Sequence, residues 1–134
     1  MFPYDATHNP PAPTARVTFA CVGAGPDATR IEAQMLVDTG ADVSLIPRAI
    51  VDAINAAPTG RTMDVVSFDD HKSARPVIAA SMHLGKYKIN AELLLHDEGE
   101  TIGIIGRNIL NLLYVVLDGP TGVWSVGRAN PQGT

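Results

Sequence analysis

Short apolar segments separated by turn-forming residues run through most of this sequence and constrain its fold more than any other feature. Residues 30–37 and 87–95 are typical, because each is rich in apolar side chains and each follows a turn that contains glycine. Two further stretches place apolar residues at helical spacing, the first of them directly after Pro47. We predict strands at residues 16–22, 30–37, 42–46, 61–68, 75–84, 87–95, 102–105, 114–117 and 123–126, and short helices at residues 47–55 and 107–112. This pattern predicts a mostly β domain with closed or sandwich-like sheets.

The two ends of the chain differ from the segments between them. Residues 1–14 include four prolines and show almost no apolar periodicity, which is typical of a flexible leader. Residues 128–134 have the same character. A chain of 134 residues has room for one domain. We therefore predict a leader at residues 1–14, one domain at residues 15–127 and a flexible tail at residues 128–134.

The composition argues against several classes of function. The formal net charge is −4 and no run of lysine or arginine occurs, so we expect no nucleic-acid surface. The longest apolar stretch, residues 102–117, contains Arg107 and is shorter than the roughly 20 residues that a membrane-spanning helix needs. The first residues lack a signal-peptide pattern, so we expect no membrane association and a cytoplasmic location.

Metal, serine and cysteine chemistry find little support in the sequence. The four histidines are His8, His71, His83 and His96. None of them has the close spacing of a zinc motif, so we expect no metal and no cofactor, and we expect His71 and His96 to be solvated loop residues. Cys21, the only cysteine, is expected to be a small buried strand residue, and Ser44 is expected to be structural.

A carboxylate stands at the end of an apolar strand, in the segment Leu36-Val37-Asp38-Thr39-Gly40. Burying a carboxylate is costly unless it is paired or hydrogen-bonded, so Asp38 at this position requires an explanation. Gly40 gives the following turn a backbone freedom that a side chain would deny. Taken alone, the tripeptide is equally compatible with an ordinary turn between strands and with a catalytic site.

Two later segments are candidate parts of the same site as this carboxylate. Residues 104–110 contain a buried strand that stops at Gly106 and continues into an apolar helix beginning with Arg107. Between the two motifs lies a pair of strands around the polar tip Asp69 to Lys72. Taken singly, these segments fit a plain strand-to-helix junction and a simple exposed hairpin.

The motif Asp38-Thr39-Gly40-Ala41-Asp42, followed by Ile105-Gly106-Arg107-Asn108-Ile109-Leu110, resembles the retropepsin family of retroviral and related aspartic proteases. The resemblance covers most of residues 16–126 and suggests a cellular member of the family, such as a bacterial one. It implies a retropepsin-like closed barrel or sandwich, the acid protease fold, with one or two short helices. It also implies an aspartic endopeptidase that works as a homodimer on extended peptide substrates.

The resemblance also implies roles for individual residues. Asp38 matches the catalytic aspartate, Thr39 matches a threonine whose hydroxyl bonds across the dimer axis, and the Gly40 carbonyl matches a group that grips the substrate backbone. Asp42 and Arg107 match a structural ion pair within each subunit. The residues of the resulting substrate-binding set are Gly40, Ala41, Asp42, Phe68, Asp69 and Asp70. Pocket-lining candidates are Val43, Ile78 and Ile104.

The sequence departs from the retroviral pattern in three places. The hairpin tip that stands where the family has its flap contains no glycine between Ser67 and Arg75 and carries several charges. A helix is predicted after Pro47, and the chain ends in a predicted hairpin at residues 114–126 where retroviral members have a single terminal strand. The dimer interface is therefore expected to be built differently.

The proposed chemistry needs two carboxyl groups that share a proton, so that one activates a water and the other hydrogen-bonds the peptide carbonyl. Only one Asp-Thr-Gly occurs in the chain, so a second subunit must supply the other carboxyl. Ala41 cannot donate the hydrogen bond that a serine could give to the carboxylate. We therefore expect a pH optimum less acidic than about pH 2, the range of stomach-type relatives. The alternative from a different class is a non-catalytic dimerisation or peptide-binding module with the same fold, which the altered hairpin tip favours.

Overall fold

The structure is a computed structural model that describes residues 1–66 and 69–127. Within these residues it contains ten strands and two short helices. The strands are β1 (Phe2–Asp5), β2 (Ala12–Ala20), β3 (Ile31–Val37), β4 (Leu45–Ile46), β5 (Pro58–Val66), β6 (Lys72–Leu84), β7 (Tyr87–Leu95), β8 (Gly103–Ile105), β9 (Tyr114–Asp118) and β10 (Val123–Gly127). The helices are α1 (Arg48–Ile54) and α2 (Arg107–Leu110). The predicted mostly β architecture is therefore confirmed.

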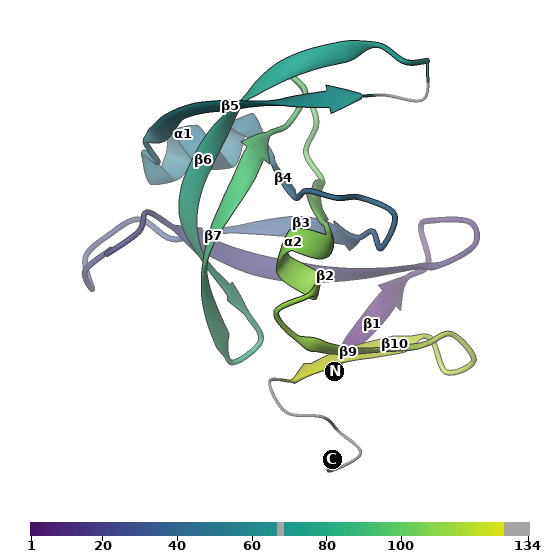
Figure 1. The fold of residues 1–134 in the computed structure, drawn as a ribbon. Helices are drawn as coiled ribbons and strands as arrows, with labels where there is room; N and C mark the ends of the chain where they lie inside the picture. The colour runs from purple at the N-terminus through teal and green to yellow at the C-terminus, as the bar shows by residue number, and fades with distance from the viewer. Residues whose placement is uncertain (67–68, 128–134) are drawn as a thin grey trace.

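Six of the strands close into a barrel. The hydrogen-bonded order is β5-β6-β7-β4-β8-β3-β2-β1-β10-β9, and an additional antiparallel pairing joins β6 to β2. This pairing closes the ring β6, β7, β4, β8, β3 and β2, so β5 projects from one end of the order and β1, β10 and β9 extend the other (Figure 1). Because closure removes free strand edges, only the two ends of this order remain open among the described strands.

The barrel interior is filled by alternate residues of its strands. Along β2, the inward positions Ala15, Val17 and Phe19 are all buried, whereas Arg16 between them is exposed. This period of two is the expected signature of a strand with one face on a core. Trp124 of β10 is 1% exposed and donates its indole N–H to the Thr14 carbonyl at 2.8 Å, which ties the β1-β10-β9 extension to the barrel.

Helix α1 begins directly after Pro47, as predicted. It buries Val51 and Ile54 against the barrel and ends at Asn55, whose backbone is left-handed with φ of 55°. Asparagine tolerates this conformation better than most residues, so it suits the end of a helix. The next segment differs from expectation, because β5 already begins at Pro58 and not at Arg61.

The N-terminal segment is a correction to the sequence prediction. Residues 1–14 are not a separate flexible leader, because β1 pairs with both β10 and β2, and β2 already begins at Ala12. The Phe2 ring lies 4.7 Å from the Trp124 ring, and the Tyr4 N–H donates to the Gly122 carbonyl at 2.8 Å. The predicted tail at residues 128–134 lies outside the described residues.

Cys21 is a smaller correction. It lies just after β2 and is partly exposed, so it is not a buried strand residue. Within the described part of the chain, neither helix has the length and apolar character needed to cross a membrane.

Candidate active site

Asp38 follows the last residue of β3 at the point where two parallel strands end together. Val37 of β3 is in register with Ile105 of β8, and the Asp38 N–H donates to the Ile105 carbonyl at 3.0 Å. Beyond it the chain turns back, because the Ala41 N–H donates to the Asp38 carbonyl at 3.2 Å. The carboxylate Oδ1 accepts the Gly40 N–H at 2.9 Å. Asp38 is thus a half-buried carboxylate whose loop is held by backbone hydrogen bonds.

Gly106 allows a second segment to pass directly beneath this loop. A side chain at this position would lie 2.6 Å from the Val43 carbonyl carbon and 2.9 Å from the Ala41 oxygen, and closest of all to the Val43 oxygen. These atoms belong to the backbone, which cannot move aside as a flexible side chain can. The close approach lets the Arg107 N–H donate to the Ala41 carbonyl at 2.9 Å. Glycine is therefore required at this crossing.

The Arg107 side chain fastens the outer part of the same loop. Its Nη1 donates to the Thr39 carbonyl at 2.8 Å, and its Nη2 forms an ion pair with the Asp42 carboxylate. The two charged groups are 43% and 82% exposed, so water screens their attraction. The structure thus contains the ion pair that the resemblance implied, and its geometric role is to hold the carbonyl of the residue after Asp38.

A buried polar chain, which the sequence analysis did not foresee, completes the support. Ser44 is fully buried, and its hydroxyl accepts the Gly106 N–H at 2.8 Å and donates to the Asn108 Oδ1 at 2.7 Å. The Asn108 amide then donates to the Glu92 carbonyl of β7 at 3.0 Å. Ser44 was expected to be structural, and it is. The sequence did contain a clue to the role of Asn108, because this polar residue stands near the start of a helix whose remaining residues are mostly apolar.

The β5–β6 hairpin projects from the barrel beside this region (Figure 1). Asp69 and Asp70 lie at its exposed tip, and Asp70 has a left-handed backbone with φ of 61°. Phe68, the third substrate-binding candidate of this tip, lies outside the described residues. The tip therefore presents carboxylates at the position where the family resemblance implies a flap.

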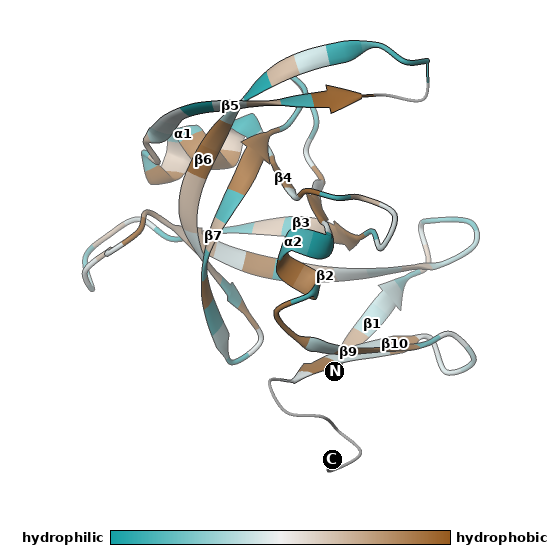
Figure 2. Ribbon diagram, viewed as in Figure 1, coloured by the Kyte–Doolittle hydropathy of each residue, from teal (hydrophilic) through white to brown (hydrophobic). Residues whose placement is uncertain are grey.

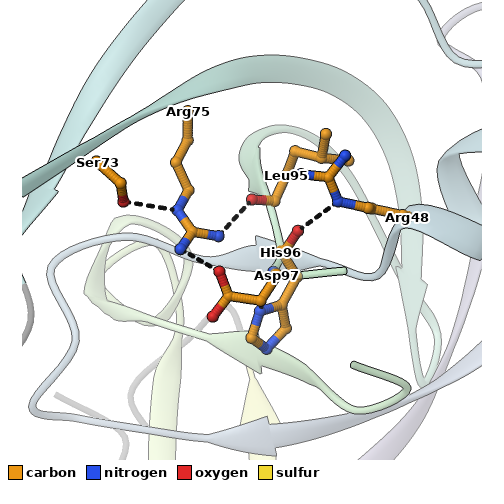
Figure 3. Close-up of polar contacts among 6 residues, drawn as sticks. All are labelled: Arg48, Ser73, Arg75, Leu95, His96 and Asp97. Carbon is orange, nitrogen blue, oxygen red and sulfur yellow. Dashed lines mark hydrogen bonds and ion pairs between the residues drawn. The ribbon is translucent and has the colours of Figure 1, made fainter. Parts of the chain in front are cut away.

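Arg75 anchors the hairpin to the loop after β7 (Figure 3). Its side chain is 16% exposed and donates to the Leu95 carbonyl at 3.1 Å and to the Ser73 hydroxyl at 3.3 Å. It also forms an ion pair with Asp97. A nearly buried guanidinium needs such partners, because burying an unpaired charge is costly. This arginine joins strands β6 and β7 to the loop that leads into β8.

His96 lies in the same cluster and is a further correction to the sequence prediction. It is partly buried rather than solvated, its Nδ1 accepts the Asp97 N–H at 2.7 Å, and its carbonyl accepts the Arg48 Nε at 3.1 Å (Figure 3). Burial lowers the pKa of the imidazole below its ordinary value of 6.5, while the carboxylates of Glu100 and Asp97 oppose that shift. The cluster thus favours the neutral imidazole.

The structure brings some of the predicted site residues together and separates others. The loop at residues 38–42 and the segment from Gly106 to Asn108 form one hydrogen-bonded unit. Ile78 is 1% exposed and belongs to the core, and it lines a pocket together with Val51 of α1 and Leu95 of β7. Val43 and Ile104 remain partly exposed near the loop. Among the described residues, no group of three or more His, Cys, Asp or Glu is arranged to hold a metal ion.

This arrangement limits the chemistry that one chain can perform. Asp38 is half-buried and accepts a backbone N–H, so it is fixed in place and still open on one side. A single carboxylate can act as a general base, but it cannot at the same time donate a proton to a substrate oxygen. The described part of the chain places no second carboxylate in an equivalent loop. Catalysis by an acid and a base of this kind would require a second copy of the loop.

Comparison with known proteins agrees with this geometry. Residues 29–112 match the sequence profile of a family described as gag-polyprotein putative aspartyl protease. The match contains both the Asp38 loop and the Gly106 crossing. A search of curated protein sequences found no match.

Three solved structures share the fold. The EIAV protease complexed with the inhibitor HBY-793 has a TM-score of 0.54 at 21% identity, over 75% of this chain and 86% of that one. A retropepsin-like aspartic protease from Rickettsia conorii has a TM-score of 0.56 at 12% identity, over 88% and 83%. The foamy viral protease-reverse transcriptase has a TM-score of 0.52 at 17% identity, over 75% of this chain but only 12% of that one. At these identities the likeness establishes the retropepsin-like fold.

Proposed function

Because this chain belongs to the gag-polyprotein putative aspartyl protease family, we propose that it is an aspartic endopeptidase assembled from two identical subunits. The observation that carries the proposal is the Asp38 carboxylate, half-buried, hydrogen-bonded to the Gly40 N–H and supported from below by the Gly106 crossing. This is a carboxylate held rigidly on a scaffold, which is what acid–base catalysis by a carboxyl pair requires.

The proposed mechanism uses Asp38 from each subunit. Two carboxyl groups facing each other across a two-fold axis cannot both ionise readily, so they share one proton. The ionised partner takes a proton from a water molecule as that water attacks the peptide carbonyl. The protonated partner donates a hydrogen bond to the carbonyl oxygen as negative charge develops there. No covalent intermediate forms.

The substrate is proposed to bind as an extended peptide between the Asp38 loop and the β5–β6 hairpin. An extended backbone can hydrogen-bond like an added strand, with alternate side chains directed into pockets. We propose that Gly40, Ala41 and Asp42 contact the peptide from below, and that Asp69 and Asp70 face it from the hairpin tip. Two carboxylates at the tip favour peptides with basic side chains near the cut bond.

The decisive experiment measures peptide cleavage by wild type and by Asp38→Asn. Pure protein is incubated with a mixed peptide library across pH, with and without a statine-type transition-state mimic. We expect Asp38→Asn to lower turnover by more than about 10³-fold, since it removes both the base and the shared proton. The matched control is Asp27→Asn, which changes an exposed turn carboxylate and is expected to leave turnover unchanged.

The rival function is a non-catalytic dimeric binding module, favoured by the glycine-free, charged hairpin tip. The same experiment separates the two. Equal cleavage by wild type and Asp38→Asn would assign the activity to a contaminant. Peptide binding without cleavage at any pH would support the binding module, and full activity in a strictly monomeric preparation would refute the shared-proton mechanism.

A further inference from the structure

The outer half of the β5–β6 hairpin contributes nothing to the core. None of the described side chains among residues 58–76 is buried, and burial along β6 begins at Val77. Figure 2 shows the same change along β6, which is mostly hydrophilic near the hairpin tip and hydrophobic where it joins the barrel. Without apolar packing, the position of this half depends on its polar contacts. The side chain that ties it to the loop after β7 is Arg75.

The ionic partner of Arg75 is itself bonded to a titratable group. Asp97 forms the ion pair with Arg75, and the Asp97 N–H donates to the His96 Nδ1 at 2.7 Å (Figure 3). Nδ1 accepts a hydrogen bond only while the imidazole is neutral, because both ring nitrogens carry a proton in the charged form. Asp97 therefore connects the hairpin anchor to the protonation state of His96.

The surroundings of His96 decide which residue moves when a proton binds. The His96 N–H donates to the Ile46 carbonyl at 2.9 Å, and the His96 carbonyl accepts the Arg48 Nε at 3.1 Å, so its backbone is fixed by β4 and α1. The Asp97 side chain is 63% exposed. A proton on Nδ1 would face the Asp97 N–H, and two donors repel each other at this distance. The exposed residue, Asp97, is the one free to give way.

The charges around the imidazole act in both directions. Burial has the largest effect and lowers the pKa of His96, and the guanidinium of Arg75 on β6 lowers it further. The carboxylates of Glu100 and Asp97, both in the loop after β7, raise the pKa. Arg48 of α1 contacts the backbone carbonyl of His96. Once charged, the imidazole would also attract the Asp97 carboxylate and so compete with Arg75 for it.

We propose that His96 is a pH-sensitive control of the hairpin: a proton bound at Nδ1 displaces Asp97, weakens its ion pair with Arg75 and lets the outer half of the hairpin open. The closed arrangement binds fewer protons than the open one, because its imidazole has a lowered pKa. The hairpin is therefore closed above the ordinary histidine pKa of 6.5 and opens as the pH falls below that value. Only the consequence rests on the proposed function, namely that opening admits an extended peptide to the Asp38 loop.

Hydrogen exchange of the protein without substrate tests the opening directly. Exchange is followed by mass spectrometry between about pH 7.5 and about pH 5, on either side of the histidine range. Each rate is divided by that of a free amide at the same pH, so the pH dependence of the exchange chemistry cancels. We expect exchange at residues 62–66 and 72–75 to rise about fivefold at the lower pH, the effect of losing one ordinary hydrogen bond. Exchange in β2 and β3 should not change.

Two histidine variants assign the titrating group. His96→Asn places an amide oxygen at the position of Nδ1, so it can accept the Asp97 N–H at every pH and should abolish the pH-dependent opening. The matched control is His71→Asn, which removes the histidine at the tip of the same hairpin and should leave the opening as in wild type. Arg75→Ala lacks the anchor, so its hairpin should be open at both pH values. Circular dichroism checks that each variant is folded.

Several results would overturn the proposal. These are a wild-type hairpin whose exchange does not depend on pH, an opening that persists in His96→Asn or vanishes in His71→Asn, and a further opening of Arg75→Ala at low pH. The last comparison is decisive if His96→Asn does not fold. The opening should also persist in Asp38→Asn, which excludes the catalytic carboxyl as its cause. A pH-dependent hairpin in a protein that cleaves no peptide would support this inference and reject the proposed function, whereas cleavage with a pH-independent hairpin would do the reverse.

Discussion

The Asp38 loop and the β5–β6 hairpin are the two halves of the proposed site, and they are held in opposite ways. The loop is fixed mainly by backbone hydrogen bonds, which join it to β8 and to the segment that begins at Gly106. The hairpin is exposed along β5 and is tied to the loop after β7 by the side chain of Arg75. The carboxylate thus sits on a rigid floor, while the covering element depends on a few polar contacts that can break separately. This division suits an enzyme that must admit a peptide without moving its catalytic group.

The largest effect is expected from a substitution that fills the space beneath the Asp38 loop. Gly106→Ala places a methyl group against the backbone of Val43 and Ala41, so we expect it to lower the free energy of unfolding by about 3 kcal/mol and to abolish activity. Urea unfolding at one fixed protein concentration measures the change. Gly25→Ala is the matched control, because a side chain there would meet nothing within 4 Å. Equal stability of the two variants would show that the backbone of the Asp38 loop can move aside at the Gly106 crossing.

The next largest effect is expected in the hairpin. Arg75→Ala removes three contacts of a nearly buried guanidinium, so we expect a loss of about 1.5 kcal/mol in stability. Hydrogen exchange should increase first at the amides of β5 and β6 and leave those near Asp38 unchanged. Arg75→Lys keeps the charge but not the fork of donors, so its stability should lie between that of wild type and that of Arg75→Ala. A uniform increase of exchange over the whole barrel would contradict a local anchor.

A smaller difference in stability is expected between loss of the Arg107 ion pair at the Asp38 loop and loss of the Arg61 ion pair at the hairpin. Arg107→Ala should cost about 1 kcal/mol, since it removes the hydrogen bond to the Thr39 carbonyl together with an exposed ion pair. Arg61→Ala breaks the exposed pair with Glu92 at the hairpin base and should cost less than about 0.5 kcal/mol. If both changes cost the same, the bond to Thr39 contributes nothing. Arg107→Ala should also lower kcat, whereas Arg61→Ala should not.

The smallest expected effect is a pH dependence from the hairpin anchor. Because the pKa of His96 is lowered by burial, the folded protein binds fewer protons at this site than the unfolded chain does. The contribution of His96 to stability is therefore present above its ordinary pKa of 6.5 and is lost as the pH falls through the range below that value. Between about pH 7.5 and about pH 5, wild type should lose more stability than His96→Gln does. Parallel losses in urea unfolding would contradict a neutral, buried imidazole.

Much of the architecture could be predicted from local patterns. Residues 87–95 were assigned as a strand with the bounds that β7 has, and the helix after Pro47 is present. Local sequence sufficed because these elements have strong periodicity and clear turn residues at their ends. The ion pair of Asp42 with Arg107 followed from the family motif.

The remaining features depend on partners far away in the sequence. The sequence predicts a leader where β1 lies, because prolines dominate this segment, but Phe2 packs on Trp124, more than a hundred residues later. The sequence predicts a solvated loop position for His96 and the start of a strand for Arg75, and nothing local shows the distant partners of either side chain. The hydroxyl of Ser44 gains its role only when Gly106 arrives beneath it. Such contacts are products of tertiary packing, which a local pattern does not encode.

The order of the strands has a consequence for synthesis of the protein. Chains leave the ribosome N-terminus first, at about 5–20 residues per second. β3 emerges long before β8, its parallel neighbour, and β1 before β10, its antiparallel one. The loop at Asp38 therefore has no support until residues 103–108 have been made. β1 cannot pair with β10 until residues 123–127 have been made. A nascent chain that lacks residues 103–108 is expected to carry the acid group on an unformed loop, so the proposed peptidase activity would require these residues to have been made.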